Sequence, residues 1–158
     1  MAFDAFLKID GIPGESQDAK HKGEIDVLSF QWGVAQSTTG GRSSGRPTGR
    51  ADVQDFTIMK FLDKASPLLF AAACHGDHIS SAIFTLRKAG ESPIDFYKVT
   101  LSDIVITNVS PNGTAGGEVT TPIEEVSFNF SRVEITFTPQ DATGSPGQPV
   151  TTTCSSHR

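Results

Sequence analysis

Four side chains that could bind a metal ion lie close together in the chain, at Cys74, His75, Asp77 and His78. Zinc sites usually combine pairs of ligands from separate elements, and the sequence offers no second cluster of this kind. An apolar segment that ends in a histidine followed by Gly76 is also typical of a helix C-terminus. We therefore predict that this stretch ends a helix, and we expect no metal site.

Residues suited to nucleophilic or acid–base catalysis are present, but their spacing is unsuitable. Cys74 and His75 are adjacent and would point to different faces of a helix, and no Gly-x-Ser-x-Gly motif surrounds a serine. Glu124 and Glu125 are adjacent as well, and on a strand their carboxylates would point to opposite faces. The sequence predicts no catalytic residue, no cofactor site and a protein that is not an enzyme.

A polar stretch at residues 37–50, called the arm below, contains three arginines and four glycines and no large apolar residue. It lacks the Gly-Lys-Ser/Thr end of a phosphate-binding P-loop. It can be a solvated loop or an interaction arm, because loops of this length are uncommon in compact domains and are often functional. We expect contacts with a neighbouring subunit, made by residues Gly40, Gly41, Arg42, Arg46 and Arg50.

Most of the remaining chain has the two-residue period of half-buried β-strands. Strands are expected at residues 2–10, 24–36, 51–61, 79–88, 94–109 and 126–137. The apolar phase slips by one residue at 27–28, at 102–103 and at 131–132. A two-residue period cannot absorb such a slip, so we expect a bulge or bend at each place, in strands that curve around a closed barrel.

One helix is expected, at Ser66–His75, with Ser66 as its N-cap and Pro67 in its first turn. The predicted core includes Phe30, Trp32, Leu69, Phe128, Phe130 and Ile135. From Pro139 onward the sequence is polar and predicts a loosely ordered segment. We therefore expect one domain at residues 1–140 and a polar tail at residues 141–158.

Composition narrows the class of protein further. With 158 residues, eleven phenylalanines and a net charge of −5, the chain can bury one core and has no basic footprint for nucleic acid. No apolar stretch is long enough for membrane insertion, and the start lacks the features of a Sec signal peptide. The two cysteines, Cys74 and Cys154, lie in very different surroundings, which disfavours a disulfide between them.

Several short segments resemble, in order and spacing, the haemolysin-coregulated protein (Hcp) family, the tube subunits of the bacterial type VI secretion system. They are residues 14–16, Asp18, His21, 24–28, 32–33, Asp63 with 66–76, 86–90, 96–97 with Leu101, and 125–128 through 139–140. Together they cover nearly the whole chain to about residue 140. One departure concerns the C-terminal end, because the family usually continues into a further segment with an aromatic, often Gly-Trp. Here the last strand is expected to be short or absent.

The resemblance implies a mainly β fold, a barrel or two-sheet domain of bent strands with one short flanking helix, similar to phage tail-tube proteins. It also implies a hexameric ring, rings that stack into a tube, and partnership with spike protein, sheath and effectors. The protein would reside in the bacterial cytoplasm before firing and then be secreted without a cleaved signal peptide.

The strand pattern also predicts which residues face the inside of such a ring. If Leu28, Phe30 and Trp32 face the core, Ser29, Gln31 and Gly33 face away from it and are free to line a lumen that holds effectors. The alternative is a monomeric β-sandwich that binds a ligand such as a carbohydrate. Such a module usually presents an exposed aromatic platform, which this sequence does not predict.

Overall fold

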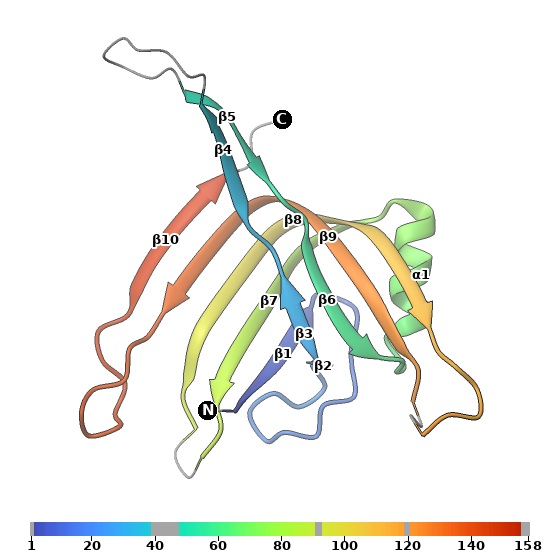
Figure 1. The fold of residues 1–158 in the computed structure, drawn as a ribbon, viewed down its shortest axis with the longest axis horizontal. Coiled ribbons are helices and arrows are strands. Elements are labelled where there is room, and N and C mark those ends of the chain that lie inside the picture. Colours follow the sequence, from blue (N-terminus) through green and yellow to red (C-terminus); the bar gives the residue numbers. More distant parts are fainter. Residues whose placement is uncertain (1, 39–47, 91–92, 119–120, 156–158) are drawn as a thin grey trace.

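A computed structural model describes residues 2–38, 48–90, 93–118 and 121–155, and all structural statements below concern these residues. They form ten strands and one helix (Figure 1). The elements are β1 (Phe3–Ile9), β2 (Ile25–Val27), β3 (Ser29–Gln31), β4 (Val34–Thr38), β5 (Thr48–Val53), β6 (Phe56–Phe61), α1 (Ser66–His75), β7 (His78–Lys88), β8 (Asp95–Asn112), β9 (Ile123–Phe137) and β10 (Val150–Ser155).

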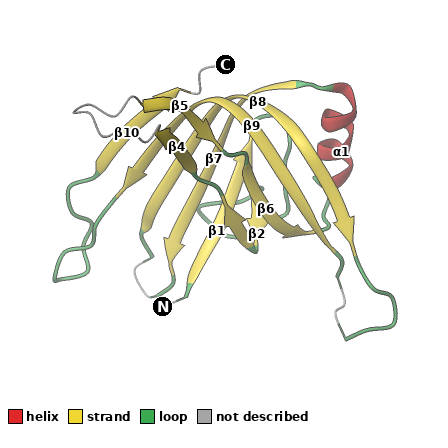
Figure 2. Cartoon of the chain, turned by 45° about the horizontal axis from the view of Figure 1, so that its top comes forward, coloured by secondary structure: helices red, strands yellow, loops and turns green. Residues whose placement is uncertain are grey.

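The main sheet curls into a nearly closed barrel (Figures 1 and 2). Its strands follow the order β2-β1-β7-β8-β9-β6-β3, and β10 pairs with β9 beside this path. The two ends of the path, β2 and β3, are separated by Leu28 alone, so the chain itself joins the two edges of the sheet. The predicted fold class, mainly β with bent strands and one short flanking helix, is confirmed.

All three predicted slips coincide with changes of strand direction. At Leu28 the chain leaves its partner β1 and pairs with β6 instead. Asp103 has a positive φ of 53°, and it interrupts β8 opposite Ser131 of β9, whose hydroxyl donates to its carboxylate at 2.7 Å. The two remaining slips therefore lie side by side in the neighbouring strands β8 and β9, and both strands bend at the same place.

The core is mainly aliphatic, and it includes the buried rings of Phe56, Phe84, Phe128 and Phe130. Leu69, Phe128 and Phe130 are buried as predicted. The prediction is only partly right for Phe30, Trp32 and Ile135, which pack against the core but stay partly exposed. Phe30 lies in β3 at one end of the strand order, Trp32 follows that strand directly, and Ile135 lies in the second half of β9. Each fully buried phenylalanine contributes about 1.5–3 kcal/mol before entropy is counted.

Helix α1 has the predicted limits but a different N-cap. Its N-cap is Ala65, which makes no side-chain capping bond, while Gly76 ends the helix with a left-handed φ of 63°. Ser66 is already the first helical residue; its hydroxyl donates to the Glu124 carboxylate at 2.7 Å and accepts from the backbone N–H of Asp63 at 3.0 Å. Leu69 and Ala72 face the barrel and are buried, whereas Leu68 and Phe70 are exposed.

Two segments are more ordered than the sequence predicts. The arm at residues 37–50 is not one loop, because β4 continues to Thr38 and β5 begins at Thr48. The expectation of a loosely ordered chain from Pro139 is wrong at β10, which pairs with the second half of β9. β6 pairs only with the first half of β9, so β10 satisfies backbone groups that would otherwise form an open edge.

Candidate functional site

The most prominent feature is the β4–β5 hairpin, which projects beyond one end of the barrel (Figure 1). Its root is fixed by hydrogen bonds. Gln54 N–H donates to the Gly33 carbonyl at 2.9 Å. The Asp55 carboxylate accepts from Thr107 Oγ1 of β8 at 2.7 Å and from Asn129 Nδ2 of β9 at 3.0 Å. Asp55 thus ties the hairpin to two central strands and holds the direction in which it projects.

The predicted interaction residues of the arm fall between β4 and β5 in the sequence or within β5. Gly40, Gly41, Arg42 and Arg46 are outside the described residues. Arg50 belongs to β5, but only its backbone is described. Contacts of these five residues with a neighbouring subunit therefore stay a prediction.

The predicted two faces of the β3 region are partly confirmed. Ser29 and Gln31 are exposed and Gly33 is half-buried. On the other face, the Trp32 ring lies 5.4 Å from that of Phe56 and packs into the core. Leu28 does not share this inner face: 49% of its surface is exposed, because it sits at the corner between β2 and β3.

A buried ion pair fixes the start of α1 to the barrel. Lys60 of β6 and Glu124 of β9 are direct cross-strand partners with 0% and 1% exposure, and Lys60 Nζ donates to the Glu124 carboxylate at 2.6 Å. Lys60 also donates to Asp63 at 2.8 Å, and Ser66 donates to Glu124. The carboxylate and the ammonium therefore have several partners each, as a buried pair requires.

Comparisons with known proteins agree with this architecture. Residues 6–137 match the family model described as "Type VI secretion system effector, Hcp". The chain belongs to the Hcp family. It is 39% identical to Protein hcp1 of Pseudomonas aeruginosa over 152 residues, 95% of this chain and 93% of that protein.

Solved structures of the family show the same fold. A structure described as that of a type six secretion system protein has a TM-score of 0.90 at 29% identity, with 94% of this chain and 92% of that chain covered. Hcp1 from Salmonella typhimurium has a TM-score of 0.80 at 38% identity, with coverage of 99% and 96%. The interpretation of the sequence as a tube subunit of the type VI secretion system is confirmed over a monomeric ligand-binding module.

One loop of this Hcp-family chain, residues 10–24, is held to the barrel by a stack of three side chains. The Phe6 and His21 rings are stacked with their centroids 4.3 Å apart, and the Arg87 guanidinium lies over the Phe6 ring, 5.0 Å from its centroid. Arg87 donates to Asp18 at 2.7 Å and to Asp4 at 3.2 Å. The Arg87 hydrogen bond is the main reason why the pKa of Asp18 falls from 3.8 to about 2.

These contacts, called the loop latch below, also include two carboxylates that lie close to His21. Its Nδ1 lies 2.9 Å from Glu24 and its Nε2 lies 3.3 Å from Asp95 at the start of β8. In the sequence, Phe6 stands out as an aromatic residue in the phase of β1 that otherwise carries Asp4 and Lys8. That pattern does not predict which residues contact Phe6.

The cysteine and histidine cluster is dispersed at the end of α1. Cys74 and Cys154 are both free and exposed. His78 lies 3.2 Å from the Asp103 carboxylate on the surface. Within the described residues, no three His, Cys, Asp or Glu side chains come together in a way that could hold a metal ion.

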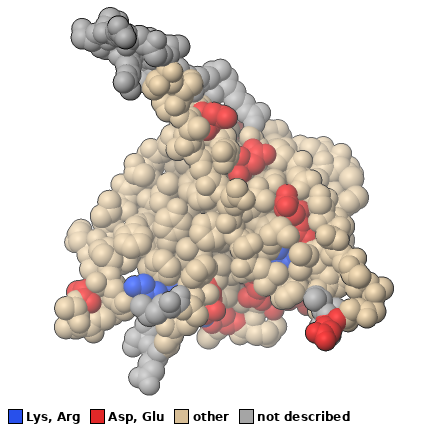
Figure 3. Space-filling model, in the orientation of Figure 1, with Lys and Arg blue, Asp and Glu red and all other residues tan. Residues whose placement is uncertain are grey.

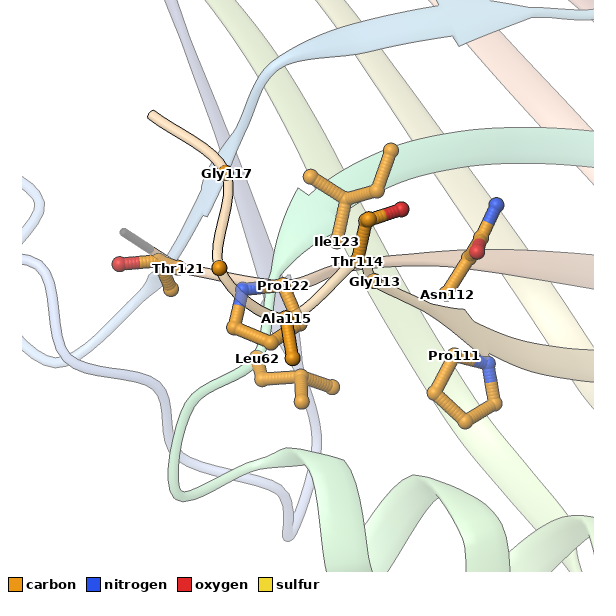
Figure 4. A pocket seen from close by; sticks show the side chains of 11 residues that line it. Leu62, Pro111, Asn112, Gly113, Thr114, Ala115, Gly117, Thr121, Pro122 and Ile123 are labelled. Atoms are coloured by element: carbon orange, nitrogen blue, oxygen red, sulfur yellow. The ribbon is translucent and has the colours of Figure 1, made fainter. Parts of the chain in front are cut away.

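An open pocket of about 890 Å³ lies under the β8–β9 connection, beside the start of α1 (Figure 4). Leu62, Ala115 and Pro122 approach one another in its wall, and Asn112 is set apart from them (Figure 4). None of its described lining residues carries an ionisable side chain. The pocket therefore provides apolar surface and no group for acid–base chemistry.

No helix in the described part of the chain is both long and apolar enough to cross a membrane.

Proposed function

We propose that this Hcp-family chain closes into homohexameric rings, and that the rings stack end to end into the secretion tube. The hairpin that projects from one end of the barrel with a fixed root carries this proposal. Head-to-tail contacts form a ring when their rotation closes and a filament when it does not. A rigid projection on one end of each subunit can provide the contact between rings, which continues along the tube and does not close.

The protein's role in this proposal is structural and not catalytic. It resides in the bacterial cytoplasm before firing and is then exported with the tube. Its partners are further copies of itself, the spike protein, the sheath and effectors in the lumen. The Hcp fold and the family match over residues 6–137 support the assignment to this machine.

The decisive experiment is a native mass measurement of the purified chain. A ring-sized mass, about six times the 16.8 kDa of the monomer, supports the proposal. A mass equal to that of the monomer at all concentrations would contradict it. Replacing residues 39–47 by a short Gly-Ser turn should leave rings intact and weaken stacking, whereas unchanged stacking would mean that the arm is only a solvated loop.

We further propose that Ser29, Gln31 and Gly33 line the lumen and contact effectors. Gln31 is exposed next to a core-facing strand position, and small or amide side chains can hold cargo through weak neutral hydrogen bonds of about 1 kcal/mol each. Gln31→Glu places one new charge in every subunit of the ring. We expect it to change co-purification of an effector while ring size stays the same, with Thr151→Glu on exposed β10 as a control. Equal cargo retention by wild type and Gln31→Glu would refute the lumen assignment.

A further inference from the structure

One groove, called the N-terminal groove here, combines exposed apolar side chains with carboxylates. It has a volume of about 540 Å³ and is lined by the start of β1, residues 16–18, the end of β2 and Arg87 of β7. Phe3 and Leu28 lie on it with 50% and 49% of their surfaces exposed. Large apolar side chains left in water along a groove are typical of surfaces that bind a partner.

The charge of the groove is unbalanced. Asp4, Asp18 and Asp26 line it together with a single cation, Arg87. The guanidinium of Arg87 is already shared between Asp18 and Asp4, and within the described residues Asp26 has no ion pair with a basic side chain. Burial, followed by the nearby negative charges of Asp63, Asp18 and Asp4, raises the pKa of Asp26. A further cation would therefore be stabilised beside Asp26.

The arm has the charge that the groove lacks. It contains three arginines and no acidic residue, and without them the chain keeps ten basic against eighteen acidic side chains. Acidic side chains also outnumber basic ones on the face shown in Figure 3. An arginine can pair with a carboxylate while its guanidinium stacks on an aromatic ring and its methylene stem covers apolar surface. Asp26, Phe3 and Leu28 offer these three contacts within one groove.

The positions of the arm and the groove indicate which copy supplies the arginine. The hairpin projects from one end of the barrel, whereas the N-terminus and the end of β7, which border the groove, lie at the opposite end (Figure 1). The nine residues 39–47 can carry an arginine at most about 15 Å beyond β4 and β5, since each residue spans about 3.5 Å and the segment must return. The arm of one copy therefore suits the groove of a second copy placed end to end with it.

We propose that the N-terminal groove binds Arg42 or Arg46 from the arm of a second copy, in the next ring of a stack. This inference rests on the proposed function, because it assigns the surface that receives the arm. It makes stacking depend on charge, and the contact is repeated by symmetry once in every subunit. Stacking should weaken as salt screens the exposed charges.

The test compares stacking of purified rings of the full chain by sedimentation and electron microscopy, at about 50 mM and about 500 mM salt. The variants are Asp26→Asn, the pair Arg42→Gln with Arg46→Gln, and all three substitutions combined. Asp77→Asn is the matched control, because Asp77 is an exposed carboxylate remote from the groove-lining residues. Ring mass and circular dichroism verify that each variant still folds and forms rings.

We expect Asp26→Asn to raise the ring concentration needed for stacking about tenfold, because every subunit loses the contact. The arginine variant should have a similar effect, and the combined variant should be little worse than either alone, since all of them remove one contact. Unchanged stacking of Asp26→Asn, or effects that simply add, would overturn the inference and leave the proposed function intact. Wild-type chains that form no rings would overturn the proposed function, and the inference with it.

Discussion

Replacing Lys60 by methionine should destabilise the barrel strongly, because it leaves the buried Glu124 carboxylate without its cation. Methionine retains much of the apolar volume of lysine, so the loss is mainly electrostatic. In the variant, Glu124 keeps only the Ser66 hydroxyl as a side-chain donor among its described contacts, at 2.7 Å. Removing one member of a buried pair costs about 3–5 kcal/mol. For a domain of this size, that loss lowers the Tm by about 6–20 °C.

Urea and thermal unfolding would measure this loss, at one fixed subunit concentration because assembly adds to apparent stability. Lys98→Met is the matched control, since Lys98 is exposed on β8 and its replacement should change stability by about 0.5 kcal/mol or less. The double variant Lys60→Met with Glu124→Leu should recover most of the loss, because an apolar pair needs no partners. A loss below about 1 kcal/mol for Lys60→Met, or a double variant no better than the single one, would refute this reasoning.

Three further predictions concern the loop latch and the hairpin root. Because the pKa of Asp18 is lowered to about 2, its stabilisation is complete above its ordinary value of 3.8 and is lost as the pH falls through about 2. Asp18→Asn should therefore flatten the acid decline of the Tm in this range, and an unchanged profile would contradict the latch. Gly14→Ala should cost about 1–3 kcal/mol in urea unfolding, since its Cβ would lie 2.5 Å from the Glu24 carbonyl oxygen, whereas Gly117→Ala should be nearly neutral. Asp55→Ala should cost about 2 kcal/mol and increase hydrogen exchange at the hairpin root, and equal exchange rates would show that Asp55 does not fix it.

The sequence was sufficient to predict the limits of an element, or the place of a bend, where local signals agree with one another. Pro67 and Gly76 mark both ends of α1, and phase slips in an otherwise regular period locate the bends of the barrel. β10 could not be recognised in this way, because its run of threonines is polar on both faces and has no period. Its order comes from the open second half of β9, which is a property of the sheet and not of the segment.

The polar clusters could not be predicted because their members come from distant parts of the chain. Lys60 and Glu124 are 64 residues apart, and Arg87 and Asp18 are 69 residues apart. In hindsight, Lys60 continues the inward phase of Phe56 and Ile58, and Glu124 begins the inward phase of Val126 and Phe128. A charge in the apolar phase of one strand indicates that a partner exists, but only the register of the sheet identifies that partner.

The positions of these clusters indicate that apolar contacts stabilise the barrel, whereas polar contacts orient the elements that leave it. The middle of the barrel is packed with apolar side chains, whereas three polar clusters lie where an element leaves the barrel: Lys60 at the start of α1, Asp55 at the hairpin root and Arg87 at the loop of residues 10–24. Packing is non-directional, but hydrogen bonds to charged groups are directional. In the proposed ring, a small angular error at one projection would recur at every interface. Substitutions at Asp55 or Arg87 should therefore impair assembly under conditions in which the isolated barrel is still folded.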